Sequence, residues 1–322
     1  MLILNILLLI LGFVILIKGA DIFVDGASSV ARHFKVSKML IGLTIVAFGT
    51  SAPEFAVSVK SIISGNGDIV LGNVIGSNIL NILLILGISG LFHSLSVKSH
   101  TVQKELPIVI LFTALLSVLM LDGVFDASVV NSLTRSDGII LILFFLVFVY
   151  YLIGMMRRKT SDEEANNDDK EYLPIGKAAI FTVLGIVGII VGSNFVVDNV
   201  SALATAAGIS EKMISLTIIA LGTSLPELVT SVTATRKGEY DIAIGNVVGS
   251  NIFNIGLVLG FPIAIFGGIN EISFNIVDLI AMLLSAVLLL AFSIRDHKIA
   301  RKESIILLAV FVIYYTYVII GS

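Results

Sequence analysis

The sequence predicts an all-α polytopic membrane protein with ten transmembrane helices, arranged as two inverted five-helix repeats with broken helices at the membrane midplane. Composition is the first reason: the 322 residues are 57% hydrophobic and only 13% charged, whereas soluble domains carry roughly 25% charged residues. Apolar stretches of about 20 residues, the length that spans a bilayer as an α-helix, recur along the whole chain. The third reason is an internal duplication, described below.

Charge clusters separate the apolar stretches into ten predicted spans. In the first half they lie near residues 2–24, 39–64, 69–92, 104–121 and 138–156; in the second they lie near 174–197, 213–235, 242–266, 276–294 and 304–321. The first stretch has no basic start and no small-residue cleavage site, so we interpret it as a transmembrane helix and not as a signal peptide.

A highly charged segment divides the spans into two groups of five. Ten of the residues between Arg157 and Glu171 are charged, and such a density disfavours both a packed fold and entry into a bilayer. We therefore expect a first five-helix repeat at 1–157, a charged linker at 158–173 and a second five-helix repeat at 174–322.

The two halves are copies of one another. Shifting the sequence by 173 residues aligns a motif at 47–87 with a motif at 220–260 without a gap, and 23 of the 41 aligned residues are identical. Because five is an odd number of spans, the second copy must enter the membrane in the opposite direction from the first. Inverted repeats of this kind are typical of secondary transporters.

Lysine and arginine predict the orientation. Sixteen of the 20 lie in the connections after the odd-numbered spans, on the same side as the charged linker. Because basic residues mark the cytoplasmic side, we expect a multi-pass protein of the cell membrane with both termini extracellular and the linker cytoplasmic.

Composition also argues against several functions. The chain has no cysteine, which removes thiolate metal sites and cysteine nucleophiles, and its net charge of -3 gives no basic footprint for nucleic acid. All four histidines lie in predicted connections, so no histidine-assisted active site is expected at membrane depth. We expect no enzyme, no cofactor, no nucleic acid and no obligate protein partner.

Two carboxylates lie where lipid disfavours them. The second and seventh spans contain the sequences GTSAPE, ending at Glu54, and GTSLPE, ending at Glu227, each about halfway along the apolar run. A charge at that depth costs about 2.5 to 3.5 kcal/mol on insertion scales, so it usually marks an ion path. Pro53 and Pro226 lack an N–H, so each helix should break there and free backbone oxygens beside the carboxylate.

Polar side chains recur at matching depth in the third and eighth spans. Both contain the pattern GN-x-x-GSN-x-x-N. A separation of four residues places two side chains on the same helix face, and it relates these pairs: Thr50 and Glu54, Ser77 and Asn81, Thr223 and Glu227, and Ser250 and Asn254. The result is an all-oxygen site that suits calcium better than magnesium, because calcium accepts six to eight oxygens in irregular geometry. Asn73, Asn78, Asn246 and Asn251 are equally compatible with helix packing alone.

At these two motifs the sequence resembles the cation/calcium exchanger superfamily, and within it the prokaryotic sodium/calcium exchangers. The likeness extends over nearly the whole chain. It implies a secondary active antiporter that exchanges sodium for calcium by alternating access and expels calcium, with the two ions and the lipid bilayer as its partners. Exchange of three sodium ions for one calcium would carry a net charge, which is worth about 2.3 kcal/mol per 100 mV.

The resemblance also implies particular ligands. Calcium would be bound by Glu54, Glu227, Thr50 and Thr223. Sodium would be bound in two flanking sites, one formed by the Ala47 carbonyl, Thr50, Ser77 and Glu227, the other by the Ala220 carbonyl, Thr223, Ser250 and Glu54. A central layer would contain Ser51, Ser224, Asn81 and Asn254. Asn254 departs from relatives that have aspartate there, which argues against potassium cotransport.

The main alternative is a proton/calcium antiporter, in which the two glutamates would exchange protons and not sodium. A channel is a second alternative, but channels do not need two inverted copies with broken helices. An intramembrane enzyme is the third, and the positions of the histidines argue against it.

Overall fold

The structure is a computed structural model that describes residues 2–125, 130–157, 172–208, 220–270, 272 and 275–321. Elements of the first half are α1 (Leu2–His33), α2 (Lys38–Ile41), η1 (Gly42–Val46), α3 (Ala47–Thr50), α4 (Ala52–Ile63), α5 (Gly67–Leu80), η2 (Asn81–Leu86), α6 (Gly87–Phe92), β1 (Leu95–Ser96), η3 (Thr101–Glu105), α7 (Leu106–Leu119), α8 (Asp122–Phe125) and α9 (Arg135–Arg157). The elements written η are π-helical turns.

Elements of the second half repeat much of this order. They are α11 (Ile175–Ala206), α13 (Ala220–Thr223), α14 (Leu225–Arg236), α15 (Tyr240–Phe253), η5 (Asn254–Leu259), α16 (Gly260–Phe266), α17 (Ile276–Asp296), β2 (Lys298–Ile299) and α18 (Arg301–Gly321). The fold is therefore nearly all-helical. Strand β2 lies before the last helix, whereas β1 lies before α7. Strands β1 and β2 were not predicted; they pair antiparallel through Leu95 with Ile299 and Ser96 with Lys298.

Most of the predicted spans are present as long apolar helices. Among the described residues, eight helical segments are long and apolar enough to cross a membrane, and a ninth span is formed if the bent pair Lys38–Thr50 and Ala52–Ile63 counts as one. That pair bends by 47°. The first part of the span predicted at 213–235 lies outside the described residues, as does most of the predicted charged linker.

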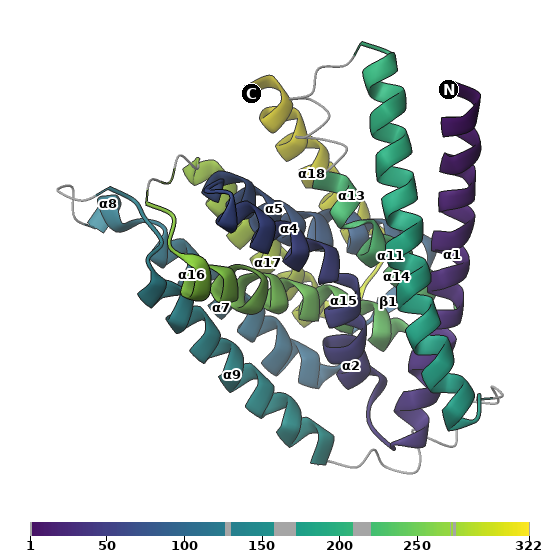
Figure 1. The fold of residues 1–322 in the computed structure, drawn as a ribbon. Helices are drawn as coiled ribbons and strands as arrows, with labels where there is room; N and C mark the ends of the chain where they lie inside the picture. Colours follow the sequence, from purple (N-terminus) through teal and green to yellow (C-terminus); the bar gives the residue numbers. More distant parts are fainter. Residues whose placement is uncertain are drawn as a thin grey trace.

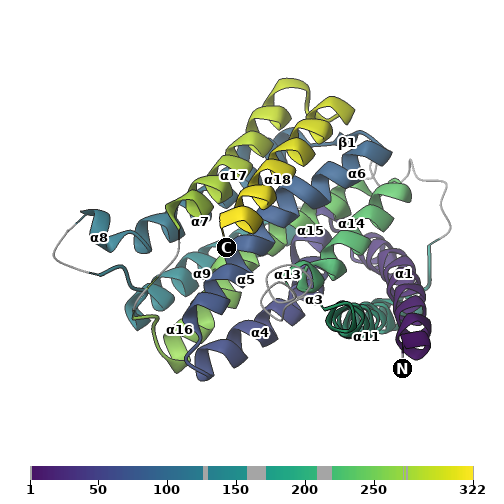
Figure 2. The same cartoon turned by 90° about the horizontal axis from the view of Figure 1, so that it is seen from above.

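The two longest helices, α1 and α11, lie side by side at one edge of the molecule (Figures 1 and 2). Glycines let their backbones approach closely. A Cβ added at Gly192 would lie 2.5 Å from the Leu16 nitrogen, and one added at Gly19 would lie 2.8 Å from the Gly188 carbonyl carbon. Small residues give helices in lipid this kind of close contact.

The buried apolar residues form two separate clusters. The larger includes α5, η2, α7, α9, α15, η5 and α17, while the smaller combines residues of α1 and α11 with others from α2, η1, α14 and α15. The smaller cluster therefore packs the α1/α11 pair against the main bundle.

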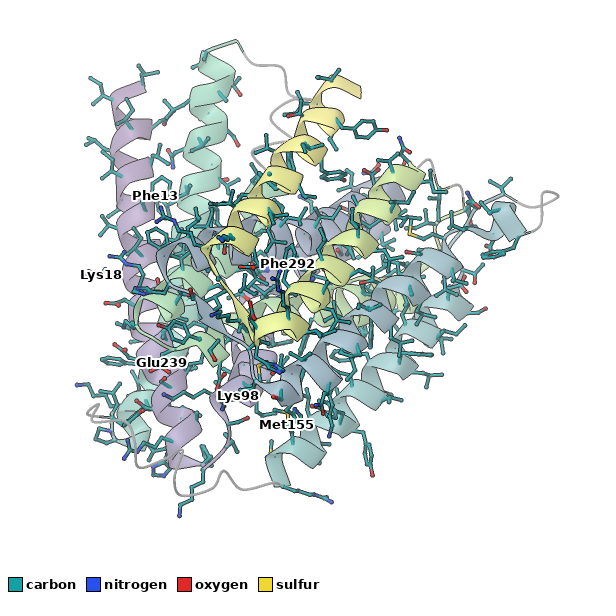
Figure 3. The ribbon with its side chains drawn as sticks, turned by 180° about the vertical axis from the view of Figure 1, so that it is seen from behind. Phe13, Lys18, Lys98, Met155, Glu239 and Phe292 are labelled. Atoms are coloured by element: carbon teal, nitrogen blue, oxygen red, sulfur yellow. The ribbon has the colours of Figure 1, made fainter. Side chains whose placement is uncertain are left out.

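Both termini lie at one end of the molecule, and the end of α9 lies at the other (Figure 1). Ion pairs gather toward this second end, where Figure 3 shows Glu239 and Lys98. Lys38 Nζ lies 2.9 Å from Glu239 Oε2. Lys237 Nζ, just past α14, lies 2.7 Å from both Asp21 Oδ1 and Asp25 Oδ1 on α1. The two Lys237 pairs join α1 to the main bundle.

Candidate cation site

Two helix breaks bring the buried glutamates to the centre of the molecule. Ser51 separates α3 from α4 with φ −81° and ψ 6°, and Ser224 separates α13 from α14 with φ −88° and ψ 4°. In each case proline is the second residue of the following helix and glutamate the third, as the sequence predicted for a proline break. The carboxylate thus lies in a first helical turn, where the exposed N–H groups favour negative charge.

Glu227 is held by hydroxyl groups from both halves of the chain. Its Oε1 accepts a hydrogen bond from Ser51 Oγ at 3.0 Å and a longer one from Ser250 Oγ at 3.4 Å. Its side chain, like that of Glu54, belongs to a residue only 1% exposed. Both carboxyl groups are therefore removed from solvent.

Several oxygens of this region lack a donor. Five of the buried oxygens that accept no hydrogen bond within the described part of the chain belong to the two glutamates and two motif asparagines: Glu54 Oε1 and Oε2, Glu227 Oε2, Asn81 Oδ1 and Asn254 Oδ1. A buried polar group without a partner costs about 1 to 3 kcal/mol, and more if it is charged. A bound cation would remove that cost.

Asn246 supports the Glu227 side of the site. It accepts a hydrogen bond from Thr50 Oγ1 at 3.0 Å through Oδ1. Its Nδ2 donates to the Glu227 carbonyl at 3.4 Å and to Ser231 Oγ at 2.9 Å. Packing and a functional role were equally compatible with Asn246 in the sequence; the structure places it against both a predicted ligand and the backbone of another.

Asn73 occupies the equivalent place beside Glu54. Thr223 Oγ1 donates to Asn73 Oδ1 at 3.4 Å, and Asn73 Nδ2 donates to the Glu54 carbonyl at 3.1 Å. The two flanks differ in access, because Thr50 and Asn246 are fully buried while Thr223 and Asn73 are only partly so.

The predicted groups with serine ligands are partly rearranged. Ser224 Oγ donates to Ser77 Oγ at 3.2 Å, so these two serines from opposite halves meet. Ser250, which the resemblance placed with Glu54, instead bonds Glu227. In this conformation the Ser250 hydroxyl therefore lies with the other carboxylate of the pair.

Backbone carbonyls near the breaks are not all free. The Ala47 carbonyl accepts from Ser51 N at 3.0 Å and from Thr50 Oγ1 at 3.3 Å. Ala220 is the first residue of α13. The Gly222 carbonyl, expected to be freed by Pro226, accepts from Ser193 Oγ of α11 at 3.1 Å. The helix break thus also links α13 to the α1/α11 pair.

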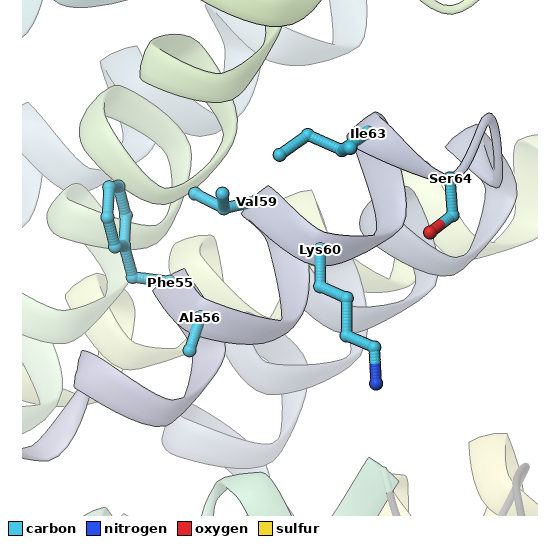
Figure 4. A pocket seen from close by; sticks show the side chains of 6 residues that line it. All are labelled: Phe55, Ala56, Val59, Lys60, Ile63 and Ser64. Carbon is cyan, nitrogen blue, oxygen red and sulfur yellow. The ribbon is translucent and has the colours of Figure 1, made fainter.

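A cavity of about 340 Å³ reaches the more accessible flank. Its lining includes Pro53, Thr223, Asn194 and Asp198, the last two from α11. An apolar groove of about 560 Å³ adjoins it through Ala56 and continues along α4 past Lys60 to Ser64 (Figure 4). Thr223 thus borders a cavity, whereas Thr50 is buried.

Within the described ranges, the site contains two carboxylates, those of Glu54 and Glu227. No three His, Cys, Asp or Glu side chains cluster as a metal centre in those ranges. The site's remaining oxygens come from amides, hydroxyls and carbonyls. Such a set combines two carboxyl groups with many neutral oxygen ligands, which suits cations that bind and leave.

Comparisons with known proteins match the chain over most of its length. The family model described as sodium/calcium exchanger protein matches residues 4–154 and, separately, 177–320. The sodium/calcium exchanger MaX1 of Methanosarcina acetivorans is 35% identical, with 97% of each chain covered. The inner membrane protein YrbG of Escherichia coli is 35% identical over 89% of this chain and 88% of its own. Solved structures of the sodium-calcium exchanger NCX_Mj, soaked with sodium and calcium, match with a TM-score of 0.83 and 31% identity over 98% of this chain and 99% of theirs.

Proposed function

This chain belongs to the sodium/calcium exchanger protein family, and from that premise we propose that it exchanges sodium for calcium by alternating access and expels calcium. The family consists of membrane antiporters and not of enzymes. Two of the similar proteins are named for sodium and calcium, namely the sodium/calcium exchanger MaX1 and the sodium-calcium exchanger NCX_Mj, the second of which was soaked with both ions. We carry those two ions over to this chain as substrates.

One observation supports the proposal most strongly: the five buried oxygens without a donor at Glu54, Glu227, Asn81 and Asn254. They come from both halves, they include both intramembrane carboxylates, and they are the hard oxygen ligands that calcium prefers. If internal hydrogen bonds alone completed the site, these oxygens would have donors, because buried polar atoms are normally paired.

The proposed calcium ligands are Glu54, Glu227, Thr50 and Thr223. For sodium we propose the Ala47 carbonyl with Thr50, Ser77 and Glu227, and the Ala220 carbonyl with Thr223, Ser250 and Glu54. Ser51, Ser224, Asn81 and Asn254 complete the layer between them. Since Ser250 bonds Glu227 here, its place in the second sodium set requires a hydroxyl that turns toward Glu54 when ions exchange.

Competition for shared ligands gives the exchange its physical basis. Glu54 and Glu227 would neutralise one calcium, and three sodium ions would leave the loaded site at +1. An empty site with two carboxylates is costly to expose to lipid, so the protein should change its open side only when loaded. Sodium entering down its gradient then expels calcium.

The proposed topology is two five-helix repeats of opposite orientation, at 1–157 and 174–322, joined by a cytoplasmic linker at 158–173. Separate matches of the family model to each half support the duplication. Both termini lie at one end of the molecule and the end of α9 lies at the other (Figure 1), as an odd number of spans per half requires. The bias of basic residues places the termini outside the cell.

Proton coupling is the second candidate. A proton needs only a carboxylate, whereas Glu227 also receives Ser51 and Ser250 hydroxyls, which are sodium ligands in kind. This observation favours sodium.

The deciding experiment measures calcium flux in vesicles containing the purified full chain. An imposed sodium gradient should drive calcium uptake, and an imposed pH gradient in sodium-free buffer should not. Calcium uptake that follows the pH gradient and ignores sodium would favour the proton mechanism over sodium coupling. Calcium uptake when neither gradient is imposed would contradict antiport altogether.

A further inference from the structure

Four asparagines form a closed set of hydrogen bonds beside the glutamates. Asn78 Nδ2 donates to the Asn251 carbonyl, and Asn251 Nδ2 donates to the Asn78 carbonyl, both at 3.3 Å. Asn81 Nδ2 donates to Asn251 Oδ1 at 2.9 Å, and Asn254 Nδ2 donates to Asn78 Oδ1 at 3.1 Å. All four residues are at most 2% exposed.

The backbone fixes the direction of this set. A carbonyl can only accept, so Asn78 must present its nitrogen to the Asn251 carbonyl. The Asn78 oxygen then points the other way and can only accept, so Asn254 must present its nitrogen to it. Asn254 Oδ1 is then the oxygen that receives no hydrogen bond, and it is buried. The same steps from the Asn78 carbonyl leave Asn81 Oδ1.

The two backbone carbonyls lie just before π-helical turns: η2 begins at Asn81 and η5 at Asn254. The Asn78 carbonyl also accepts the backbone N–H of Asn81, and the Asn251 carbonyl that of Asn254. Because a carbonyl oxygen has two lone pairs, it can accept the side-chain donor from the other half as well.

We propose that Asn78 and Asn251 are positioning residues that lock the amides of Asn254 and Asn81 with their oxygens, and not their nitrogens, available to the transported cation. The role rests on the proposed function, which supplies the cation. An amide turned by half a rotation would present N–H groups to a positive ion. Asn78 and Asn251 prevent that rotation without touching the cation.

The first test measures calcium binding to the purified full chain by titration calorimetry. Asn78→Ser removes the acceptor that orients Asn254, and it should weaken calcium binding about tenfold, the effect of one lost ligand of about 1.4 kcal/mol. Asn199→Ser is the matched control. Asn199 is also a buried asparagine that donates Nδ2 to a carbonyl, that of Phe195 at 2.7 Å, but it lies in α11 outside the set, so its loss should leave binding unchanged.

The second test is a rescue that separates orientation from packing. A carboxylate has oxygens at both ends and cannot be misoriented. Asn254→Asp should therefore restore calcium binding in the Asn78→Ser chain. In the otherwise unchanged chain, Asn254→Asp places a carboxylate oxygen against Asn78 Oδ1. Its gain in calcium binding there should be smaller, or binding should weaken. Asn251→Ser with Asn81→Asp repeats the test from the other half if Asn78→Ser fails to fold.

The outcomes are distinguishable. An Asn78→Ser chain that binds calcium within twofold of the unmodified chain would overturn the positioning role alone. So would an equal effect of Asn254→Asp with and without Asn78→Ser. An unmodified chain that binds no calcium would overturn the proposed function, and this role with it.

Discussion

Ser51 Oγ donates a hydrogen bond to Glu227 Oε1 at 3.0 Å, and this bond joins the breaks of two helices from opposite halves of the chain. Glu227 consequently has one oxygen without a donor, whereas Glu54 has two. The two carboxylates occupy equivalent positions in the duplicated motif, but they are not equivalent in this conformation. Glu54 is the more available of the two to an incoming cation.

Neutralising either glutamate should abolish calcium transport. Glu54→Gln and Glu227→Gln each remove one of two charges at nearly constant volume, leaving a single carboxylate opposite a divalent ion. Calcium flux in vesicles, normalised to the amount of monodisperse protein, should fall below detection for both variants. Near-normal flux in either variant would contradict a site centred on these two residues.

Ser77→Ala should affect sodium more than calcium. Ser77 is a proposed sodium ligand, and it contacts Ser224 and neither carboxylate among the hydrogen bonds described above. Loss of a hydroxyl ligand of about 1 kcal/mol should raise the half-saturating sodium concentration about fivefold. Calcium affinity should change less than twofold. Ser89→Ala is the control, because Ser89 is buried in α6, outside the site.

Ser250→Ala should behave differently from Ser77→Ala. Ser250 donates to Glu227 Oε1, so its removal alters a proposed calcium ligand as well as a sodium ligand. The half-saturating concentrations of both ions should rise in exchange assays. A rise for sodium alone would mean that the Ser250–Glu227 contact is absent in the calcium-bound state.

Cysteine labelling should test the inverted topology. The chain contains no cysteine, so single cysteines report without background. Asn66→Cys and Arg236→Cys place exposed reporters near the equivalent ends of α4 and α14. Glu239, the strict equivalent of Asn66, is buried beside Lys38 and would report poorly. A membrane-impermeant reagent should label Asn66→Cys in intact cells and Arg236→Cys only after permeabilisation; labelling of both from one side would rule out the inverted arrangement.

Gly192→Ala should destabilise the α1/α11 pair. Its new Cβ would lie 2.5 Å from the Leu16 nitrogen, and backbone cannot move aside as a flexible side chain can. Overpacking of this kind costs about 1 to 3 kcal/mol. Gly176→Ala on the same helix meets nothing within 4 Å and is the control. Thermal unfolding in detergent should show a lower midpoint for Gly192→Ala only; equal midpoints would mean that the two helices are not in close contact.

Hydropathy and duplication predicted the membrane-spanning, helical class of fold, because the length of an apolar run and the period of a repeat are properties of the sequence. The break before Glu54 was also predictable, because Pro53 has no backbone N–H to donate. The pairing of β1 with β2 could not be predicted. It joins two-residue strands from distant connections, and no periodic pattern marks so short an element.

The residues of the site were predicted more fully than their contacts. Glu54, Glu227 and the neighbouring hydroxyls follow from their cost in lipid, and the structure brings them together; their roles as ligands stay predictions. The motif asparagines were undecided, because interhelical packing and ion binding select the same residue. Only the direction of the side-chain hydrogen bonds separates Asn78 from Asn81. That direction depends on which backbone carbonyls of the other half the amides meet, and four-residue spacing does not reveal it.

The contact of Lys237 with Asp21 and Asp25 exposes the transport machinery to ionic strength. Lys237 follows the last residue of α14, the helix that presents Glu227 in its first turn. The side chains of its partners on α1 are 43% and 50% exposed, so dissolved salt can screen the attraction, with a Debye length of about 8 Å at 0.15 M and about 3 Å at 1 M. Sodium would then act twice, as a ligand at the centre and as an electrolyte at the edge of the same helix. Choline chloride at matched concentration supplies the second effect without the first.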